Sequence, residues 1–477
     1  METGQRLRVS CESMEKDMIN PEIKQQLKEI VGSEHFTDSL IDLIAFSKDA
    51  SEFKHRPDAA VWPTTAEQIS AILKLANREV FPVIARGAGT SLAGLVVPQQ
   101  GGLILDFGRM NKILEIRIED RLAVVQPGVV YADLERALAP HGFFFPPDPA
   151  SGAVCTLGGN VATNAGGIRG AKYGTTRDYV LGLEVVLPNG DRLRTGSRCM
   201  KSVSGYDLTR LFVGSEGTLG VMTEIILKIN PKPPASSTAL ATFEVLEDAG
   251  RAVSEVMHSG ILPRALEVVD QQTLVAINQN TNLNLPEVEA LLVVETDGYT
   301  KEENEYQLAR IMDIFRKNHA RDIKKAETQK EAEALWTARK SAYGVMARIN
   351  YNLFVEDLTV PISKVPDMLR VIADLAKKYG LKIPTVGHVG DGNLHPVISF
   401  DGTNAEEVKR VEKASEELFR KVIGMGGTLT GEHGIGLAKA PFMAFEHDPV
   451  AMGVMRSLKR LFDPNNILNP GKMALDN

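Results

Sequence analysis

Two histidines stand seven residues apart around a sharp turn. His388 and His395 flank Gly390-Asp391-Gly392 in a segment that otherwise has a strand-like pattern. On one straight strand they would face opposite sides, because successive side chains alternate. The turn breaks that strand, so we expect the two imidazoles to converge. Converging imidazoles are typical of a divalent metal site, and a hydrogen-bonded turn is the alternative.

Two further side chains could act on a substrate. His433, in the glycine-rich segment 431–436, could accept a proton near pH 7 or could be a hydrogen-bonded loop histidine. Arg339, in a helix that we predict over residues 332–349, could bind a carboxylate through two parallel hydrogen bonds, although a solvated arginine is the commoner case. Trp336 and Tyr343 share its helix face and could wall a pocket or pack in the core.

A strand predicted over residues 81–86 leads directly into the loop GAGTSLAG, residues 87–94. The loop offers successive backbone N–H groups and two hydroxyls, with Arg86 at its start, which is the chemistry of a pyrophosphate cradle. The spacing does not fit the Rossmann fingerprint, and no Gly-Lys-Ser/Thr follows as in a P-loop. A tight turn is the alternative.

A second glycine-rich stretch carries seven glycines between Gly152 and Gly174. It is too poor in large apolar side chains to bury itself by ordinary packing, which favours a backbone that lies against a flat or charged group. A mobile glycine loop is the alternative. Strands predicted at 183–187 and 192–194, around a Pro188–Asp191 turn, favour an ordered segment.

Four motifs together resemble one flavoprotein domain. They are RGAGTSLAG (86–94), PPDPAS (146–151), CTLGGNVATNAGG (155–167) and GYDLTRLFVGSEGTLGVMTE (205–224). They resemble the flavin-binding domain of the vanillyl-alcohol oxidase / p-cresol methylhydroxylase (PCMH) superfamily. From about His55 to Lys472 the chain is similar to its D-lactate dehydrogenase / glycolate oxidase D-subunit / D-2-hydroxyglutarate dehydrogenase group.

The resemblance implies an α+β fold with a two-part PCMH-type FAD-binding domain. An α+β cap domain with an antiparallel sheet and a C-terminal tail that returns to the FAD domain would complete it. No histidine lies in either glycine-rich segment, so we expect FAD to be bound non-covalently. The positions that would contact FAD are Arg86, Gly87, Gly89, Thr90, Ser91, Gly94, Asp148, Thr156, Gly158, Gly159, Asn164, Gly166, Gly217, Val221 and Asn469.

The resemblance also implies a metal site and a reaction. His388, His395 and Glu432 would bind a divalent ion, and Zn²⁺, Mn²⁺ and Fe²⁺ remain open. His433 would remove the hydroxyl proton of a D-2-hydroxy acid while hydride passes from its C2 to FAD, and Asn393 would hydrogen-bond the substrate.

The substrate class follows from Arg339 and two departures from the hydroxyglutarate dehydrogenases. Those enzymes carry Thr at the place of Tyr343 and Lys near Val355, where they help to hold a distal carboxylate. Arg339 would then clamp the single carboxylate of D-lactate or glycolate, and D-2-hydroxyglutarate is the alternative. A flavin subunit that only relays electrons, or a metal hydrolase without flavin, are rival hypotheses.

Bulk properties limit partners and location. With 24% charged residues and a net charge of −7, we expect neither nucleic acid nor an anionic membrane as partner. No apolar run approaches the ~20 residues of a membrane span and no signal peptide is visible, so we expect a cytoplasmic protein, peripheral at the inner membrane at most through a partner. A homodimer is compatible with this reading.

Three cysteines limit the redox centres of the chain. Cys11, Cys155 and Cys199 are too few for a four-thiolate cluster, and we expect free thiols. Electrons would therefore leave to an external acceptor: an electron-transferring flavoprotein, an iron–sulfur subunit, a quinone or a cytochrome.

Four segments are expected along the chain. They are an N-terminal extension and helix (1–53, with 1–18 disordered), the FAD-binding domain (54–233), the cap domain (234–430) and the returning segment (431–477), with a proline-rich linker at 230–234. The first helix should be capped by Asn20 and end at Gly32, and a capping box should join Thr64 and Glu67. In the cap domain we expect helices on one face of the sheet.

Overall fold

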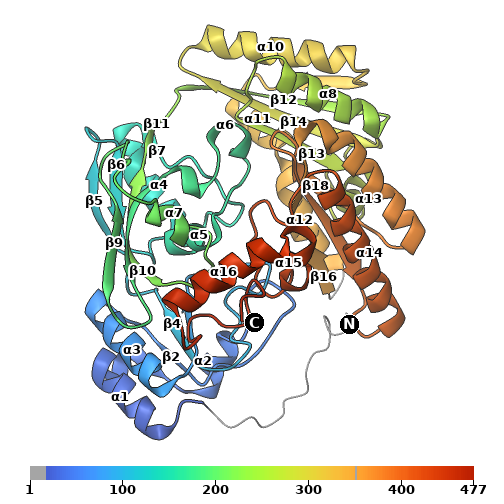
Figure 1. The fold of residues 1–477 in the computed structure, drawn as a ribbon. Helices are drawn as coiled ribbons and strands as arrows, with labels where there is room; N and C mark the ends of the chain where they lie inside the picture. The colour runs from blue at the N-terminus through green and yellow to red at the C-terminus, as the bar shows by residue number, and fades with distance from the viewer. Residues whose placement is uncertain (1–17, 350–351, 477) are drawn as a thin grey trace. The chain divides into compact units, whose positions relative to one another are not determined.

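The computed structural model describes residues 18–349 and 352–476, and these form two compact units (Figure 1). Unit 1 contains Pro233–Gly431 and the separate segment Gly166–Gly174, and unit 2 contains the described residues 18–165, 175–232 and 432–476. Within the described residues, no helix is both long and apolar enough to cross a bilayer. Cys155 is a buried free thiol and Cys199 an exposed one, whereas Cys11 and residues 1–17 lie outside the described part.

The first sheet of unit 2 is small and mostly parallel. Its order is β1 (Phe36–Thr37), β2 (Ala59–Val61), β4 (Leu103–Asp106) and β3 (Val83–Arg86), and β4 pairs in parallel with both β2 and β3. Helices α1 (Pro21–Val31) and α3 (Ala66–Glu79) bury their apolar stripes in the same core as these strands. The sheet therefore delivers the chain through β3 into the loop that follows Arg86.

The predicted N-cap of α1 is confirmed, whereas the N-cap of α3 is one residue later than predicted. Asn20 caps α1 by accepting from the backbone N–H of Ile23, and α1 ends before Gly32, as expected. The capping box at Thr64 is wrong by one residue, because Thr65 accepts from the Gln68 N–H while the backbone N–H of Thr64 donates to the Gln68 side chain.

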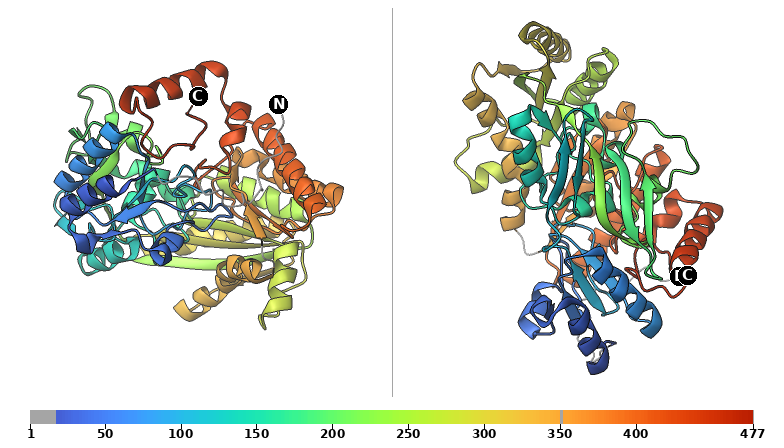
Figure 2. Two further views of the ribbon diagram at one scale, coloured as in Figure 1. Left: turned by 90° about the horizontal axis from the view of Figure 1, so that it is seen from below. Right: turned by 90° about the vertical axis from the view of Figure 1, so that its left-hand side faces the viewer.

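The second sheet of unit 2 is antiparallel and five-stranded. Its order is β5 (Ile113–Arg117), β6 (Leu122–Val125), β10 (Val221–Lys228), β8 (Val180–Val186) and β9 (Arg192–Gly196). The green strands β8 to β10 run beside one another in the right-hand view of Figure 2. A short pair, β7 (Phe143–Phe144) with β11 (Asn230–Pro231), lies outside this sheet. The remaining helices of unit 2 are α2 (Leu40–Ala45), α4 (Tyr131–Leu138), α5 (Leu157–Thr163), α7 (Leu208–Phe212), α15 (Met443–Glu446) and α16 (Pro449–Phe462).

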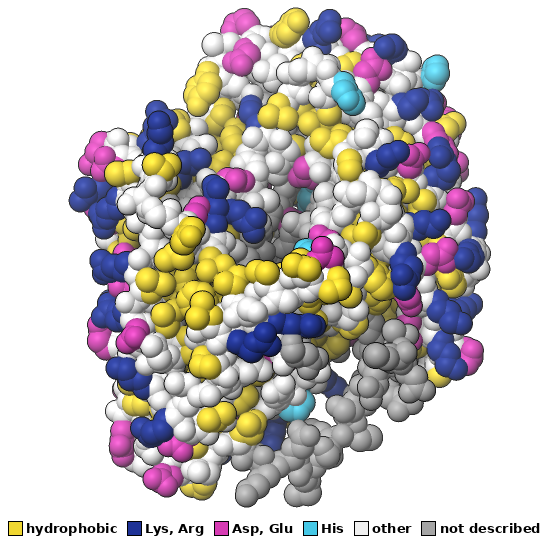
Figure 3. Space-filling model, in the orientation of Figure 1, with side chains coloured by type: hydrophobic (Ala, Val, Ile, Leu, Met, Phe, Trp, Pro, Cys, Tyr) yellow, Lys and Arg dark blue, Asp and Glu magenta, His cyan; other side chains and the backbone are white. Residues whose placement is uncertain are grey.

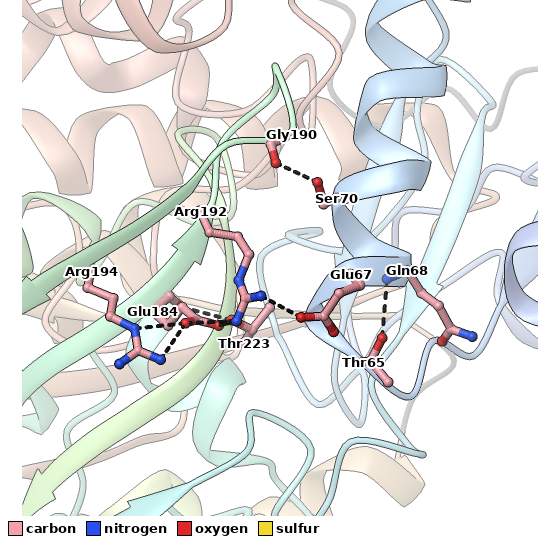
Figure 4. A network of polar contacts seen from close by, with 9 residues as sticks. All are labelled: Thr65, Glu67, Gln68, Ser70, Glu184, Gly190, Arg192, Arg194 and Thr223. Carbon is pink, nitrogen blue, oxygen red and sulfur yellow. Dashed lines mark hydrogen bonds and ion pairs between the residues drawn. The ribbon is translucent and has the colours of Figure 1, made fainter.

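A polar network joins α3 to strands β8 and β9 (Figure 4). The buried Glu184 carboxylate accepts from Arg192 at 2.9 and 3.1 Å, from Arg194 at 3.0 Å and from Thr223 at 3.0 Å. Arg192 also donates to Glu67 of α3 at 2.5 Å. Burial opposes ionisation of Glu184, but the donors outweigh it and lower its pKa below the ordinary value. The network therefore links α3, which packs with the first sheet, to strands β8 and β9 of the second sheet.

The second glycine-rich stretch contains a helix that we did not expect. Thr156 caps α5 by accepting from the Gly159 N–H at 3.3 Å. Gly158 donates to Pro127 O at 2.8 Å, and a Cβ on Gly158 would meet Pro127 at 2.6 Å. Helix propensity of the glycines is low, so this close approach to Pro127 is the reason for Gly158.

The C-terminal segment returns to the two-part domain, as predicted. Val83 N donates to Ile467 O at 2.7 Å and Asn469 N donates to Val83 O at 3.0 Å, which extends the β3 edge. Lys459 of α16 is fully buried and donates to Asp463 at 2.5 Å, and also to Thr218 O and Leu468 O. The outer face of α16 is apolar, with hydrophobic side chains visible in Figure 3 and exposed Val450, Val454 and Leu461.

Unit 1 is built on one large antiparallel sheet. Its order is β15 (Asp322–Lys325), β12 (Ala235–Phe243), β14 (Ala290–Gly298), β13 (Ala265–Asp270), β18 (Thr385–His388), β19 (Asn393–Phe400) and β16 (Asn352–Val355), and β17 (Leu358–Thr359) also pairs with β19. Its helices are α6 (Gly170–Tyr173), α8 (Leu246–His258), α9 (Gln271–Asn280), α10 (Lys301–Lys317), α11 (Gln329–Leu335), α12 (Thr337–Ile349), α13 (Val365–Tyr379) and α14 (Ala405–Gly424).

The expectation that helices cover one face of this sheet is wrong. Alternate residues of β14 point into two cores, since Ala290, Leu292 and Val294 pack in one and Leu291 and Val293 in the other. Helices α8, α10, α13 and α14 form a row on the first face (Figure 1), and α9 with α12 covers the second. The first five residues of β14, 290–294, form a continuous apolar run because both faces of the sheet are buried there.

Candidate active site

Strand register places four polar side chains on the face of the unit 1 sheet that α9 and α12 cover, called here the α12 face. In an antiparallel pair, opposite residues share a face. His388 is opposite both Glu267 and Asn393, and His395 is opposite Val386, which packs in the α12-face core. Glu267, His388, Asn393 and His395 therefore project from the same face.

The two imidazoles converge as the turn led us to expect. The ring centroids of His388 and His395 are 5.0 Å apart and the rings are nearly perpendicular, at 81°. Both side chains are buried, at 4% and 6% exposure. The arrangement is compatible with a shared ion, and the metal assignment itself stays a prediction.

A buried carboxylate lies behind His388. Glu267 has no exposed surface, and its Oε1 is 2.6 Å from His388 Nδ1. Its Oε2 accepts from Arg339 Nε at 2.7 Å. Arg339 lies in the first turn of α12, because the predicted helix breaks at Trp336, and Trp336 itself packs in the α12-face core.

A second buried carboxylate lies behind Asn393 and His395. Asp357 accepts from Asn393 Nδ2 at 2.7 Å and from Thr430 Oγ1 at 2.5 Å, and its Oδ1 is 3.6 Å from His395 Nδ1. Asn393 Nδ2 also donates to Leu358 O and Thr359 Oγ1. Since these acceptors engage the amide nitrogen, Asn393 would contact a substrate through Oδ1.

Chain connectivity brings the last two candidates to the end of unit 1. A Cβ on Gly431 would lie 2.5 Å from Asn393 Nδ2, so Gly431 packs directly against the asparagine. Glu432 and His433 follow as the first residues of the last segment of unit 2. Their side chains are within 3.9 Å of each other, from Glu432 Oε1 to His433 Nε2.

The first glycine-rich loop lies in unit 2 and is packed tightly against its neighbours. A Cβ on Gly87 would be 2.1 Å from Thr156 Oγ1, and a Cβ on Gly89, which has φ +68°, would be 2.3 Å from Arg86 Nη2. Ser91 Oγ accepts from the N–H groups of Ala93 and Leu95. The loop thus presents backbone, with two glycines where no side chain fits.

The other predicted FAD positions of this loop and of the second glycine-rich stretch have contacts within the protein. Thr90 is half-buried, and Gly94 (φ +74°) packs against Phe53 and Leu437. Thr156 and Gly159 form the cap of α5, and Asn164 ends α5 and accepts from Thr175 Oγ1 and Arg177 N.

The remaining predicted FAD positions are spread over both units. Asp148 lines a surface hollow beside Tyr131. Val221 is buried in the core at the start of β10, and Gly217 has φ +70°. Asn469 Nδ2 donates to Leu95 O and Glu216 O. Gly166 belongs to unit 1, in the segment Gly166–Gly174.

Buried polar atoms in unit 2 provide a test of whether a phosphate-bearing cofactor fits. Among the described residues, Arg86 Nη1, Asn160 Nδ2 and Asn469 Oδ1 are buried and have no hydrogen-bond partner within the protein. Arg86 is 8% exposed, and burial lowers its pKa from the ordinary value. Buried donors cost free energy unless they are paired, so Arg86 and Asn160 fit an acceptor-rich ligand such as the FAD pyrophosphate.

Several polar residues that organise these sites were missed in the sequence. Glu267 is the charged residue within the otherwise apolar residues 265–269, and a charge in a buried strand could have indicated it. Asp357 follows Glu356 in a strand-like segment in the same way. Asn160 lies inside the motif that we quoted, but its orphaned Nδ2 is visible only in the fold.

Comparisons with known proteins agree with this architecture. Residues 232–473 match the family described as "FAD linked oxidases, C-terminal domain", and residues 57–196 match "FAD binding domain". The chain is 46% identical to glycolate oxidase subunit GlcD of Bacillus subtilis, over 96% of this chain and 97% of the relative. It is 35% identical to the mitochondrial D-lactate dehydrogenase [cytochrome] of Arabidopsis thaliana, over 87% and 73% of the two chains.

A solved structure shows the same fold. p-Cresol methylhydroxylase with substrate bound superposes with a TM-score of 0.80 at 22% identity, over 95% of this chain and 96% of that one. At that identity the likeness concerns the fold alone. The match over residues 232–473 and the relatives above 30% identity show that the chain belongs to the FAD-linked oxidases of the PCMH-type fold and is an FAD-dependent oxidoreductase.

Proposed function

We propose that the protein oxidises a small D-2-hydroxy acid, with D-lactate or glycolate favoured, to the 2-oxo acid. The observation that carries this proposal is the α12 face, where two converging imidazoles, an asparagine and an arginine come together within one unit. The similarity of the chain to a glycolate oxidase subunit and to a D-lactate dehydrogenase supports it.

The residues divide the work of binding and proton removal. Arg339 keeps its Nη atoms for a substrate carboxylate, because Nε is engaged by Glu267. Asn393 accepts a hydrogen bond through Oδ1. His433 takes the hydroxyl proton as general base, which a neutral imidazole can do near pH 7.

Two groups would be held by the chain. When bound, FAD supplies the hydride acceptor, and Arg86, Asn160 and the loop around Gly87 and Gly89 would hold it non-covalently. When bound at His388, His395 and Glu432, a divalent ion such as Zn²⁺, Mn²⁺ or Fe²⁺ supplies a Lewis acid for the substrate hydroxyl. Two imidazoles and a carboxylate suit each of these ions.

We propose an external electron acceptor, either a protein partner or a quinone. The word "subunit" in the name of the Bacillus subtilis relative supports a protein partner, an electron-transferring flavoprotein or an iron–sulfur subunit. A cytoplasmic location, peripheral at the inner membrane through such a partner, and a homodimer complete the proposal.

A substrate panel tests the reaction. The FAD-loaded protein is mixed anaerobically with D-lactate, glycolate or D-2-hydroxyglutarate, and the flavin absorbance near about 450 nm is followed. We expect the two monocarboxylates to bleach it. Arg339→Lys should raise KM with little change in kcat, because it keeps the charge but loses the planar fork, whereas the exposed neighbour variant Lys340→Ala should not. Bleaching by D-2-hydroxyglutarate alone would contradict the substrate class.

The electron-relay hypothesis makes a different prediction. A relay subunit would not need a base, so His433→Ala would leave single-turnover flavin reduction by glycolate or D-lactate intact. If the chain is itself the dehydrogenase, that variant should slow flavin reduction by about 10²–10⁴-fold.

A further inference from the structure

Glu267 lies between the proposed metal ligand His388 and the proposed substrate-binding residue Arg339 and contacts both. It lies in the middle of the buried strand β13, which ends at a second carboxylate, Asp270, and the Glu267 side chain has no exposed surface. Both carboxylate oxygens are used: Oε1 lies 2.6 Å from His388 Nδ1, and Oε2 accepts from Arg339 Nε at 2.7 Å. One carboxylate thus contacts a proposed metal ligand and the proposed substrate clamp.

The contact with His388 fixes which ring nitrogen carries the proton. An ionised carboxylate only accepts hydrogen bonds, so His388 Nδ1 must be the protonated nitrogen. The lone pair of neutral His388 is then on Nε2, the ring nitrogen that would bind a metal ion. The ring is also held in orientation, because Glu267 belongs to β13 and pairs directly opposite His388 in the sheet.

The contact with Arg339 orients the guanidinium. Its side chain is only 12% exposed, and the bond from Nε to Glu267 fixes the plane of the fork. A buried arginine of this kind requires a compensating charge, which Glu267 provides.

We propose that Glu267 is a shared positioning residue that sets the tautomer of His388 and the orientation of Arg339 together. This inference rests on the proposed function, since it assumes a metal at His388 and a substrate carboxylate at Arg339. It adds a physical link between the two sites: metal affinity and substrate affinity depend on one buried side chain.

Glu267→Gln is a sharp test because an amide cannot satisfy both partners. If its oxygen accepts from His388, its NH₂ group faces the Arg339 Nε–H, and two donors meet. If its oxygen accepts from Arg339, its NH₂ donates to His388 Nδ1 and moves the ring proton to Nε2, where it blocks the metal. Either orientation damages one of the two functions, and only a carboxylate preserves both.

The first measurement is Mn²⁺ binding without turnover, and the second is KM at saturating Mn²⁺. For the first, Mn²⁺ is titrated into metal-stripped, FAD-loaded protein, and the concentration of free ion is read from its EPR signal. We expect Glu267→Gln to weaken Mn²⁺ binding about 10–100-fold, or to raise KM for D-lactate or glycolate at saturating Mn²⁺ by a similar factor. Where metal affinity falls, saturating Mn²⁺ should restore flavin reduction, which a merely damaged fold would not allow.

Two control variants distinguish a specific role of Glu267 from the general effect of removing a buried carboxylate. Glu295→Gln removes another largely buried carboxylate paired with an arginine, Arg264, on the adjacent strand, and it should leave both quantities unchanged. His388→Ala should abolish the Mn²⁺ site. Wild-type and Glu267→Gln proteins with equal Mn²⁺ affinity and equal KM would overturn the role of Glu267. A wild-type protein that binds no Mn²⁺, Zn²⁺ or Fe²⁺ would overturn the metal assignment of the proposed function instead.

Discussion

Gly87 of the first glycine-rich loop has no room for a side chain, and its replacement by alanine gives a quantitative prediction. A Cβ there would lie 2.1 Å from Thr156 Oγ1, far inside van der Waals contact. Thr156 cannot yield freely, because the same oxygen accepts from the Gly159 N–H and caps α5. Overpacking costs about 1–3 kcal/mol and the lost cap about 1 kcal/mol, so we expect a destabilisation of about 2–4 kcal/mol.

The assay is thermal unfolding of the FAD-loaded protein with the flavin content measured alongside. One kcal/mol shifts the midpoint of a domain of this size by about 2–4 °C, so Gly87→Ala should lower it by about 5–15 °C and reduce the FAD retained. Thr156→Ala alone should cost about 1 kcal/mol, or about 2–4 °C.

The double variant decides whether the clash is the cause. Gly87→Ala/Thr156→Ala removes the oxygen that the new methyl group would strike, so it should resemble Thr156→Ala alone. If the two effects add, the steric argument about this loop is refuted, because additivity means that the two sites do not interact.

Three further predictions concern charges buried in unit 2. Burial lowers the pKa of Lys472 from 10.5 to about 8. Between these pH values Lys472 is protonated in the unfolded chain but neutral in the folded protein, so the free energy of unfolding rises with pH by about 3 kcal/mol. Lys472→Met should remove this rise, which thermal unfolding at a series of pH values would measure. Glu184→Gln should lower the thermal unfolding midpoint at pH 7 relative to wild type. The difference should shrink as the pH falls through the lowered pKa of Glu184, because the carboxylate stabilises the fold only while it is ionised. Equal midpoints at pH 7 would contradict a stabilising role of the network. Lys459→Met leaves the buried Asp463 without its cation, and thermal unfolding should show a loss of about 3–5 kcal/mol, whereas an unchanged midpoint would mean that the pair adds nothing.

The sequence predicted those features of the site that depend on local patterns. The turn at Gly390–Gly392 interrupts an alternating strand, and that alone indicated the convergence of His388 and His395. The loop after β3 was predicted to present bare backbone, and Gly87 and Gly89 are indeed positions where a Cβ atom would clash. The C-terminal segment returned to the FAD-binding domain as expected, and it does so along the edge of β3.

Features that depend on pairing between distant segments could not be predicted in this way. Glu267 meets His388 across 121 positions of sequence, and only the register of β13 against β18 makes them neighbours. Helix α5 formed in a glycine-rich stretch because Gly158 packs on Pro127, so tertiary contact outweighed propensity. Helices on both faces of the unit 1 sheet could not be predicted, because a continuous apolar run such as residues 290–294 fits a buried strand or a buried helix equally well.

The segment Gly166–Gly174 shows the same limit. It groups with unit 1, where Tyr173 Oη donates to Asp297 at 2.7 Å and Lys172 pairs with the same carboxylate, and the contact of its glycines with FAD stays a prediction. Asp297 is 125 positions from Lys172, and its buried carboxylate gave no sign of this partner in the sequence.

Metal-assisted oxidation of a 2-hydroxy acid is tested by single-turnover flavin reduction with glycolate or D-lactate, before and after removal of divalent metal. We expect wild-type protein to bleach rapidly, chelation to abolish bleaching, and added Zn²⁺, Mn²⁺ or Fe²⁺ to restore it in wild type but not in His388→Ala. Bleaching that is equally fast in the chelated protein and in His388→Ala would contradict this expectation.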